Sequence, residues 1–160
     1  MDIFLLLGSN QNDPLRQLKL AQTEINLIAE GEKGVSSIYR TAPWGITNQP
    51  EFYNQVLIID SSLGPSALLA KLQAIEKKLG RIREEKWGPR IIDIDVLFYS
   101  DKIIETESLQ IPHPGIPDRR FTLEPLNEIA PDFLHPVLKK KISTLLTECN
   151  DQSYVEKLVE

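Results

Sequence analysis

The most informative segment of this chain is Trp87-Gly88-Pro89-Arg90-Ile91-Ile92-Asp93-Ile94-Asp95-Val96-Leu97-Phe98-Tyr99. Its second half is rich in β-branched and aromatic residues, which is typical of a strand, and the Gly-Pro pair marks a turn before it. Alternate side chains of a strand share a face, so Asp93 and Asp95 point the same way. The segment therefore predicts a strand with two neighbouring carboxylates on one face.

These two carboxylates predict a cation site. Like charges at this spacing repel each other, and apolar neighbours raise the cost of keeping both ionised. A divalent cation would relieve that cost, and Mg²⁺ suits the pair because it takes oxygen ligands and shares its other positions with water and substrate phosphates. The alternative is an exposed strand whose polar face carries Asp93 and Asp95 without any ligand.

The segment just upstream, from Gly80 to Arg90, is irregular and strongly charged. Glycines at both ends and a proline favour a loop that moves, and we expect a lid from about Gly80 to Pro89. Four cations precede the acidic pair: Arg81, Arg83, Lys86 and Arg90. Such cations suit a polyphosphate, since Arg presents a planar fork to phosphate oxygens. The alternative is a solvated turn whose first arginines complement a helix C-terminus.

The remaining elements alternate between strands and helices. Apolar spacing predicts helices over about 13–30, from Gly64-Pro65 up to Gly80, around 121–129 and near 138–148. Further strands are predicted over 3–7, 35–40 and 52–59. The order strand, helix, strand, strand, helix, strand indicates an α+β fold with a ferredoxin-like βαββαβ core, in which helices cover one face of an antiparallel sheet. A C-terminal helical extension follows.

Length and composition favour one domain over residues 1–160. The chain is 41% hydrophobic, which supplies a proper core, and no repeat or linker divides it. A net charge of −5 speaks against a general nucleic-acid partner. The single Cys149 cannot form an internal disulfide, and the apolar run Ile3–Leu7 is too short for a signal or membrane segment. We therefore expect a cytoplasmic protein with no membrane partner.

Five blocks of sequence together resemble one known family. They are Gly8-Ser9-Asn10, Tyr39-Arg40-Thr41, Phe52-Tyr53-Asn54, Trp87-Gly88-Pro89-Arg90 with Asp93-Ile94-Asp95, and Pro112-His113 with Arg119 and Phe121. Their order and spacing over residues 1 to about 136 resemble the 6-hydroxymethyl-7,8-dihydropterin pyrophosphokinases of folate biosynthesis. The resemblance implies transfer of the β,γ-diphosphoryl group of ATP to the hydroxymethyl oxygen of the pterin, with release of AMP.

The resemblance also implies a phosphate side of the site. Asp93 and Asp95 would hold two Mg²⁺ ions that bridge the co-substrate ATP and the attacking hydroxyl, because diphosphoryl transfer needs positioning and charge neutralisation. Arg81, Arg83 and Arg90 would be catalytic lid cations, although Glu84-Glu85 stands where the family commonly has a more basic run. The residues implied at ATP are Gln73, Glu76, Arg81, Arg83, Trp87, Arg90, His113 and Arg119.

Some of these residues have simpler interpretations. His113 lies between two prolines and would then merely pack a turn, while Gln73 and Glu76 would lie on the solvated face of a helix.

A pterin needs a flat slot and hydrogen bonds along an amide-like edge. Phe52 and Phe121 match the rings between which the family's pterin stacks, and Asn54 donates and accepts at the ring edge. Backbone groups of Thr41, Pro43 and Trp44 would complete the slot. The alternative for the two phenylalanines is plain core packing.

Two other classes fit a ferredoxin-like sheet. An RNA-binding module reads bases from aromatic residues of central strands in a basic field, whereas this chain is acidic and we expect a central strand of its sheet to carry carboxylates. A nucleotidyl transferase also places paired Asp residues on such a sheet, but it releases inorganic pyrophosphate in place of AMP. We expect a monomer that acts on two small molecules, ATP and the hydroxymethyl pterin.

Overall fold

The computed structural model of the chain describes residues 1–43, 48–80 and 91–158. Within these ranges the largest sheet has six strands in the order β5-β1-β4-β3-β8, with β2 also paired to β4. All of these pairs are antiparallel. The strands are β1 (Asp2–Ser9), β2 (Gly31–Val35), β3 (Tyr39–Thr41), β4 (Phe52–Asp60), β5 (Asp93–Tyr99) and β8 (Val155–Lys157).

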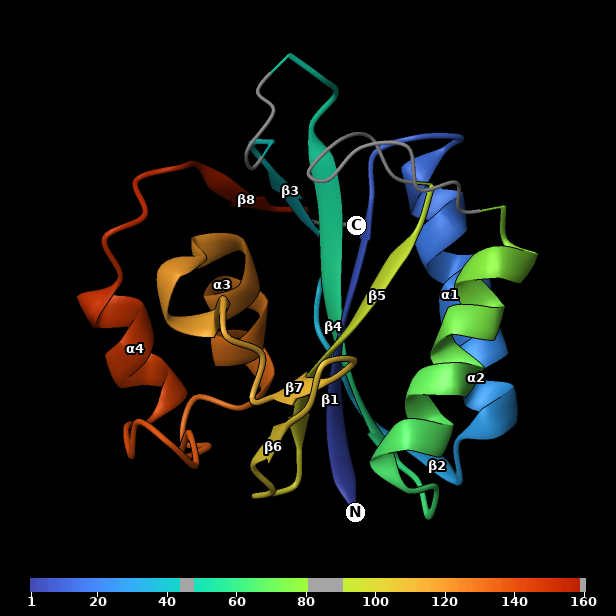
Figure 1. Cartoon of the computed structure of the whole chain (residues 1–160). Coiled ribbons are helices and arrows are strands. Elements are labelled where there is room, and N and C mark those ends of the chain that lie inside the picture. The colour runs from blue at the N-terminus through green and yellow to red at the C-terminus, as the bar shows by residue number, and fades with distance from the viewer. Residues whose placement is uncertain (44–47, 81–90, 159–160) are drawn as a thin grey trace.

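Helices cover both faces of this sheet (Figure 1). On one face lie α1 (Pro14–Ile28) and α2 (Pro65–Lys78), as expected from the sequence. The C-terminal extension covers the opposite face with α3 (Arg120–Ile129) and α4 (Ile142–Glu148), preceded by the short 3₁₀ helix η1 (Ile116–Asp118). A two-stranded hairpin, β6 (Ile104–Glu105) and β7 (Gln110–Ile111), follows β5. The molecule therefore has three layers, with the sheet in the middle.

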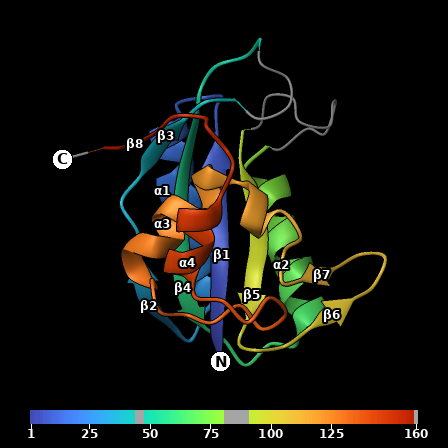
Figure 2. The same cartoon turned by 90° about the vertical axis from the view of Figure 1, so that its left-hand side faces the viewer.

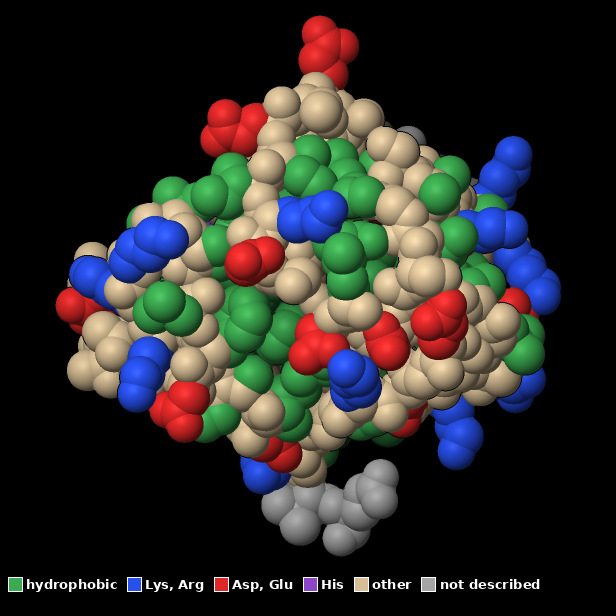
Figure 3. Space-filling view, turned by 90° about the horizontal axis from the view of Figure 1, so that it is seen from below, with side chains coloured by type: hydrophobic (Ala, Val, Ile, Leu, Met, Phe, Trp, Pro, Cys, Tyr) green, Lys and Arg blue, Asp and Glu red, His purple; other side chains and the backbone are tan. Residues whose placement is uncertain are grey.

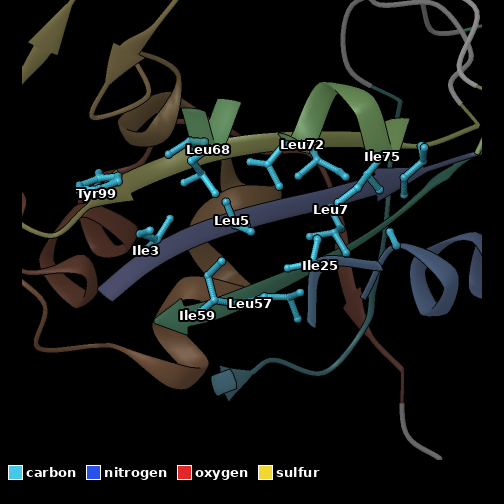
Figure 4. Close-up of a cluster of buried hydrophobic side chains, with 14 of the residues drawn as sticks. Ile3, Leu5, Leu7, Ile25, Leu57, Ile59, Leu68, Leu72, Ile75 and Tyr99 are labelled. Atoms are coloured by element: carbon cyan, nitrogen blue, oxygen red, sulfur yellow. The ribbon is translucent and has the colours of Figure 1, made fainter. Parts of the chain in front are cut away.

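The central strand β1 is buried on both faces, which explains its unbroken apolar run. Ile3, Leu5 and Leu7 point toward α1 and α2, where they meet Leu68 and Leu72 of α2 (Figure 4). The intervening residues Phe4 and Leu6 pack on the other side with residues of α3 and α4. Burial on both sides fixes the register of β1, because a shift by one residue would exchange the two sets.

Most of the predicted elements are confirmed, and two of their boundaries were wrong. The strand expected over 35–40 is split between β2 and β3, because the Oγ of Ser36 accepts the backbone N–H of Val56 at 2.9 Å and takes the place of a regular ladder bond. The last helix begins at Ile142, not near 138, because Lys139 has a left-handed backbone with φ of 58°. The short strand β8 was not predicted.

The surface fits the composition. On the face seen from below, acidic and basic side chains are mixed among hydrophobic ones (Figure 3). None of the helices in the described ranges has the length and apolar character that a membrane span needs.

Candidate functional site

The candidate residues gather at one end of the sheet, where β1 ends and β4 and β5 begin. Asn54 pairs across the strands with Gly8, and Gly8 pairs with Asp93. In the next row Leu6 pairs with both Val56 and Asp95. Leu6 and Val56 belong to the core under α3 and α4. The amide and both carboxylates therefore lie on the sheet face that carries α3.

Gly8 forms the floor between the amide of Asn54 and the carboxylate of Asp93. A Cβ atom at position 8 would lie 2.8 Å from Asn54 Oδ1, closer than side chains approach each other. The missing side chain leaves room above the sheet for a flat ligand. Sequence reasoning quoted Gly8 within a motif but did not count it as a site residue, because only the strand register shows its two neighbours.

Asn54 is held in one orientation by β3. Its Nδ2 donates to Thr41 Oγ1 at 2.8 Å, and both residues are buried, with exposures of 3% and 2%. The other amide atom, Oδ1, lies over Gly8. Thr41 and Asn54, each predicted at the pterin, are thus brought together, but through the side chain of Thr41 and not through its backbone.

Asp93 and Asp95 are partly buried on β5, which lies at the end of the strand order and not, as expected, in the centre of the sheet. Between them, the backbone N–H of Ile94 donates to Glu76 Oε2 at 2.9 Å, and Glu76 is only 7% exposed. Glu76 of α2 therefore contacts the backbone of Ile94, between the two carboxylates. Gln73 is exposed on the same helix.

The donor set on β5 fits Mg²⁺. Two partly buried carboxylates supply oxygen ligands only, and Mg²⁺ keeps several waters and takes phosphate oxygens at its other positions. Within the described ranges, no group of three or more His, Cys, Asp or Glu residues forms a closed metal cage. Asp93 and Asp95 would therefore hold the ion with its remaining positions open to substrate.

His113 is fixed as a neutral imidazole. Its Nδ1 accepts the backbone N–H of Gly115 at 3.0 Å, and its backbone N–H donates to Leu97 O at 3.0 Å. Burial lowers the pKa of His113 to about 4, with a further lowering from Arg119 and an opposing effect from Asp93. Near neutral pH the proton is therefore on Nε2, which becomes a hydrogen-bond donor.

Arg119 lies beside the acidic pair. Burial lowers the pKa of Arg119, and Asp95, Asp118 and Asp93 oppose that effect. Its guanidinium lies 5.8 Å from the ring centre of Phe121, which is partly buried at the first turn of α3. Gly115 makes room for this side chain, since a Cβ there would lie 2.6 Å from Arg119 Nε.

Two buried polar residues at the end of β1, Ser9 and Asn10, were missed as site residues. Ser9 Oγ donates to Ile91 O, and Asn10 Nδ2 donates to Gln49 Oε1 at 2.9 Å and to Pro50 O at 3.0 Å. These hydrogen bonds tie the end of β1 to Ile91, which precedes β5, and to Gln49 and Pro50, which precede β4. The sequence signal that could have identified them is a Ser-Asn pair at the end of a buried apolar strand.

Other predicted residues have different outcomes. Phe52 and Pro43 are partly buried near the ends of β4 and β3. Five predicted residues lie outside the described ranges: Trp44, Arg81, Arg83, Trp87 and Arg90. The lid expected from about Gly80 to Pro89 falls almost wholly outside them as well.

Comparison with known proteins gives consistent matches. The sequence profile of the family described as 7,8-dihydro-6-hydroxymethylpterin-pyrophosphokinase (HPPK) matches residues 4–131. A 2-amino-4-hydroxy-6-hydroxymethyldihydropteridine pyrophosphokinase of Aquifex aeolicus is 40% identical over 146 residues, covering 91% of each chain. The protein of that name from Synechocystis is 44% identical over 143 residues, covering 89% of this chain and 73% of its own.

A solved structure shares the fold. The crystal structure of a Plasmodium falciparum HPPK-DHPS triple mutant with pterin and p-hydrobenzoate superposes with a TM-score of 0.74 at 18% identity. The alignment covers 92% of this chain and 44% of that one, so this chain spans less than half of the solved protein. At this identity the likeness concerns the fold alone.

Proposed function

Because the chain belongs to the 7,8-dihydro-6-hydroxymethylpterin-pyrophosphokinase family, we infer that its site binds ATP and the pterin on opposite sides of Gly8. The protein is an ATP-dependent pyrophosphokinase of folate biosynthesis. It transfers the β,γ-diphosphoryl group of ATP to the hydroxymethyl group of 6-hydroxymethyl-7,8-dihydropterin, and AMP is the second product. The observation that carries the division of the site is the cross-strand row Asn54, Gly8, Asp93.

The phosphate side of our proposal lies on β5 and η1. Asp93 and Asp95 would hold two Mg²⁺ ions, which would supply charge neutralisation for the triphosphate and acidify the attacking hydroxyl. His113 donates from Nε2 to a phosphate oxygen, as its low pKa and its occupied Nδ1 support. Arg119 donates from its planar guanidinium to phosphate oxygens and so stabilises charge on the transferred group. The acidic pair also attracts the cation of Arg119.

The pterin side lies on β3, β4 and α3. Asn54 Oδ1 accepts from the amide-like edge of the ring, and Thr41 holds Asn54 in that orientation. Phe121 stacks on one face of the ring and Phe52 on the other, with Pro43 at the edge. This arrangement points the hydroxymethyl group across Gly8 toward Asp93, where the diphosphoryl group is presented.

The fold supports several further proposals. The strand order β5-β1-β4-β3 supports a ferredoxin-like core, and the three layers support a single domain over residues 1–160. We propose a monomer, in which Asn54, Gly8 and Asp93 of one chain serve both substrates. The sole cysteine of the sequence, Cys149, supports a reducing compartment such as the cytoplasm.

The product of the reaction tests the activity. With ATP, Mg²⁺ and the hydroxymethyl pterin, chromatography should show AMP in amounts equal to the pterin diphosphate. Release of inorganic pyrophosphate in place of AMP would indicate nucleotidyl transfer and would overturn the proposal.

A second experiment tests the two sides of the site. Asn54→Ala and Phe121→Ala should weaken pterin binding by roughly 1–3 kcal/mol each, on the scale of base stacking on aromatic rings. Binding of a non-hydrolysable ATP analogue should stay unchanged, since neither side chain touches the nucleotide. Titration calorimetry measures both, with the exposed Asn26→Ala as the matched control. Equal weakening of both ligands would mean that these residues are core residues and that the slot is misplaced.

A further inference from the structure

The last described segment, residues 151–158, lies across two elements of the pterin side. We name it the C-terminal strap. It leaves α4, passes the start of α3 and ends as β8, which lies beside β3 at the edge of the sheet (Figure 2). The family profile ends at residue 131, so the strap lies outside the part of the chain that the profile matches.

The first attachment of the strap is to the start of α3. The residue that precedes this helix, Arg119, provides no capping side chain. Asp151 supplies the cap, since its Oδ2 accepts the backbone N–H of Arg120 at 3.0 Å and its Oδ1 accepts the N–H of Ser153 at 2.9 Å. Arg120 also donates from Nη1 to Ser153 O at 3.1 Å. Two hydrogen bonds from Arg120 therefore fix the strap next to Phe121, and a third, within the strap, holds Asp151 in place.

The second attachment is to β3. Thr41 pairs with Val155, and the N–H of Ala42 donates to Tyr154 O at 3.4 Å. Arg40 forms an ion pair with Glu156 across the same two strands. On its other side, β3 holds Asn54 through Thr41. The strap thus backs the strand that orients the ring-edge amide.

A third contact joins these two elements directly. Glu128 of α3 accepts hydrogen bonds from Ser37 N at 2.8 Å and from Tyr39 OH at 2.9 Å, and it forms an ion pair with Lys157 at 3.3 Å. One carboxylate therefore connects α3, β3 and the strap.

We propose that the C-terminal strap is a positioning element for the pterin: it sets the distance between Phe121 on α3 and the Thr41–Asn54 pair on β3 and β4. The inference rests on the proposed division of the site. The strap lies at the opposite end of the strand order from β5, which carries the metal ligands. The side chain of Arg119 packs on Gly115, whereas the strap binds Arg120, the next residue. Loosening the strap should therefore change pterin binding and leave ATP binding nearly intact.

The test uses the full-length chain with Asp151→Ala. Losing this cap should raise the KM for the pterin about fivefold. This is the fold-change expected if the stabilisation that a typical helix cap provides is lost from the pterin complex. The KM for ATP should change by less than about twofold, because β5 is not attached to the strap. Asp151→Asn keeps one of the two acceptor oxygens and should lie between wild type and Asp151→Ala. Glu148→Ala, which breaks the exposed Lys140–Glu148 ion pair, is the matched control and should match wild type.

The outcomes separate clearly. A lower melting temperature with both KM values unchanged would assign the strap a structural role only and overturn the inference. An equal rise in both KM values would also overturn it. If Asp151→Ala does not fold, Glu156→Gln weakens the second attachment. It should likewise raise the KM for the pterin more than the KM for ATP. A wild-type chain that makes no AMP would defeat the proposed function itself, whereas an active wild type with unselective variants defeats the strap alone.

Discussion

Pterin binding should depend on the absence of a side chain at a single residue, Gly8. A Gly8→Ala substitution places a methyl group 2.8 Å from Asn54 Oδ1, and Asn54 cannot move freely because Thr41 holds its other end. We expect the KM for the pterin to rise about tenfold or more, the cost of roughly 1–3 kcal/mol that overpacking carries. Steady-state kinetics measure the change. Gly31→Ala is the matched control, since no atom of the described residues lies within 4 Å of the Cβ that alanine would add there. Equal pterin KM values in both variants would contradict the role of Gly8.

His113 predicts a pH dependence of stability. Its pKa falls from about 6.5 in the unfolded chain to about 4 in the folded one, so the unfolded state binds more protons between these values. The stabilisation is therefore complete above pH 6.5 and is lost as the pH falls toward 4. Between pH 7 and 4.5 this amounts to roughly 2 kcal/mol.

Urea unfolding at both pH values measures it. His113→Gln should lose correspondingly less stability than wild type, and His135, whose pKa burial also lowers, is present in both proteins. An imidazole NMR titration of His113 with a midpoint near 6.5 would contradict the prediction.

At the scale of elements, the connection between α2 and β5 determines how well the acidic pair is placed. Ile94 lies between Asp93 and Asp95, and its N–H has Glu76 as its acceptor. A buried N–H without an acceptor costs about 1–3 kcal/mol, which the strand would avoid by moving. Movement at Ile94 would displace both metal ligands.

Two substitutions of Glu76 test this connection. Glu76→Ala should lower turnover about tenfold and raise the Mg²⁺ concentration needed for half-maximal rate, because the ligands are misplaced. Glu76→Gln keeps an acceptor oxygen and should retain most of the turnover. Lys78→Ala is the control: it breaks the ion pair between Lys78 of α2 and Glu24 of α1, and it should behave as wild type. If Gln is as damaging as Ala, the charge of Glu76 acts on the nucleotide and its hydrogen bond to the backbone is secondary.

Sequence reasoning was most successful for long elements and least so for short ones. The helices α1 and α2 carry regular apolar stripes and strong starts at Pro14 and Pro65, so their patterns predicted them. The strand β8 has only three residues, of which two are charged, and its conformation comes from pairing with β3. No local pattern could have predicted it.

At the scale of the whole molecule, the site depends on strand register. Gly8, Asn54 and Asp93 are far apart in the sequence, and the antiparallel pairing of β1 with β4 and β5 makes them neighbours. The sequence could predict the acidic pair, because alternation within one strand fixes it. It could not predict the row across three strands, nor the capping of α3 by Asp151, since both depend on contacts between distant segments.

The crystal structure of the enzyme with Mg²⁺, a non-hydrolysable ATP analogue and the hydroxymethyl pterin tests the central claim most directly. We predict that the pterin ring lies over Gly8, with its amide edge on Asn54 and one face on Phe121. Asp93 and Asp95 should coordinate Mg²⁺ next to the hydroxymethyl group. A pterin ring bound away from Gly8, or metal ions without either carboxylate as a ligand, would contradict the account.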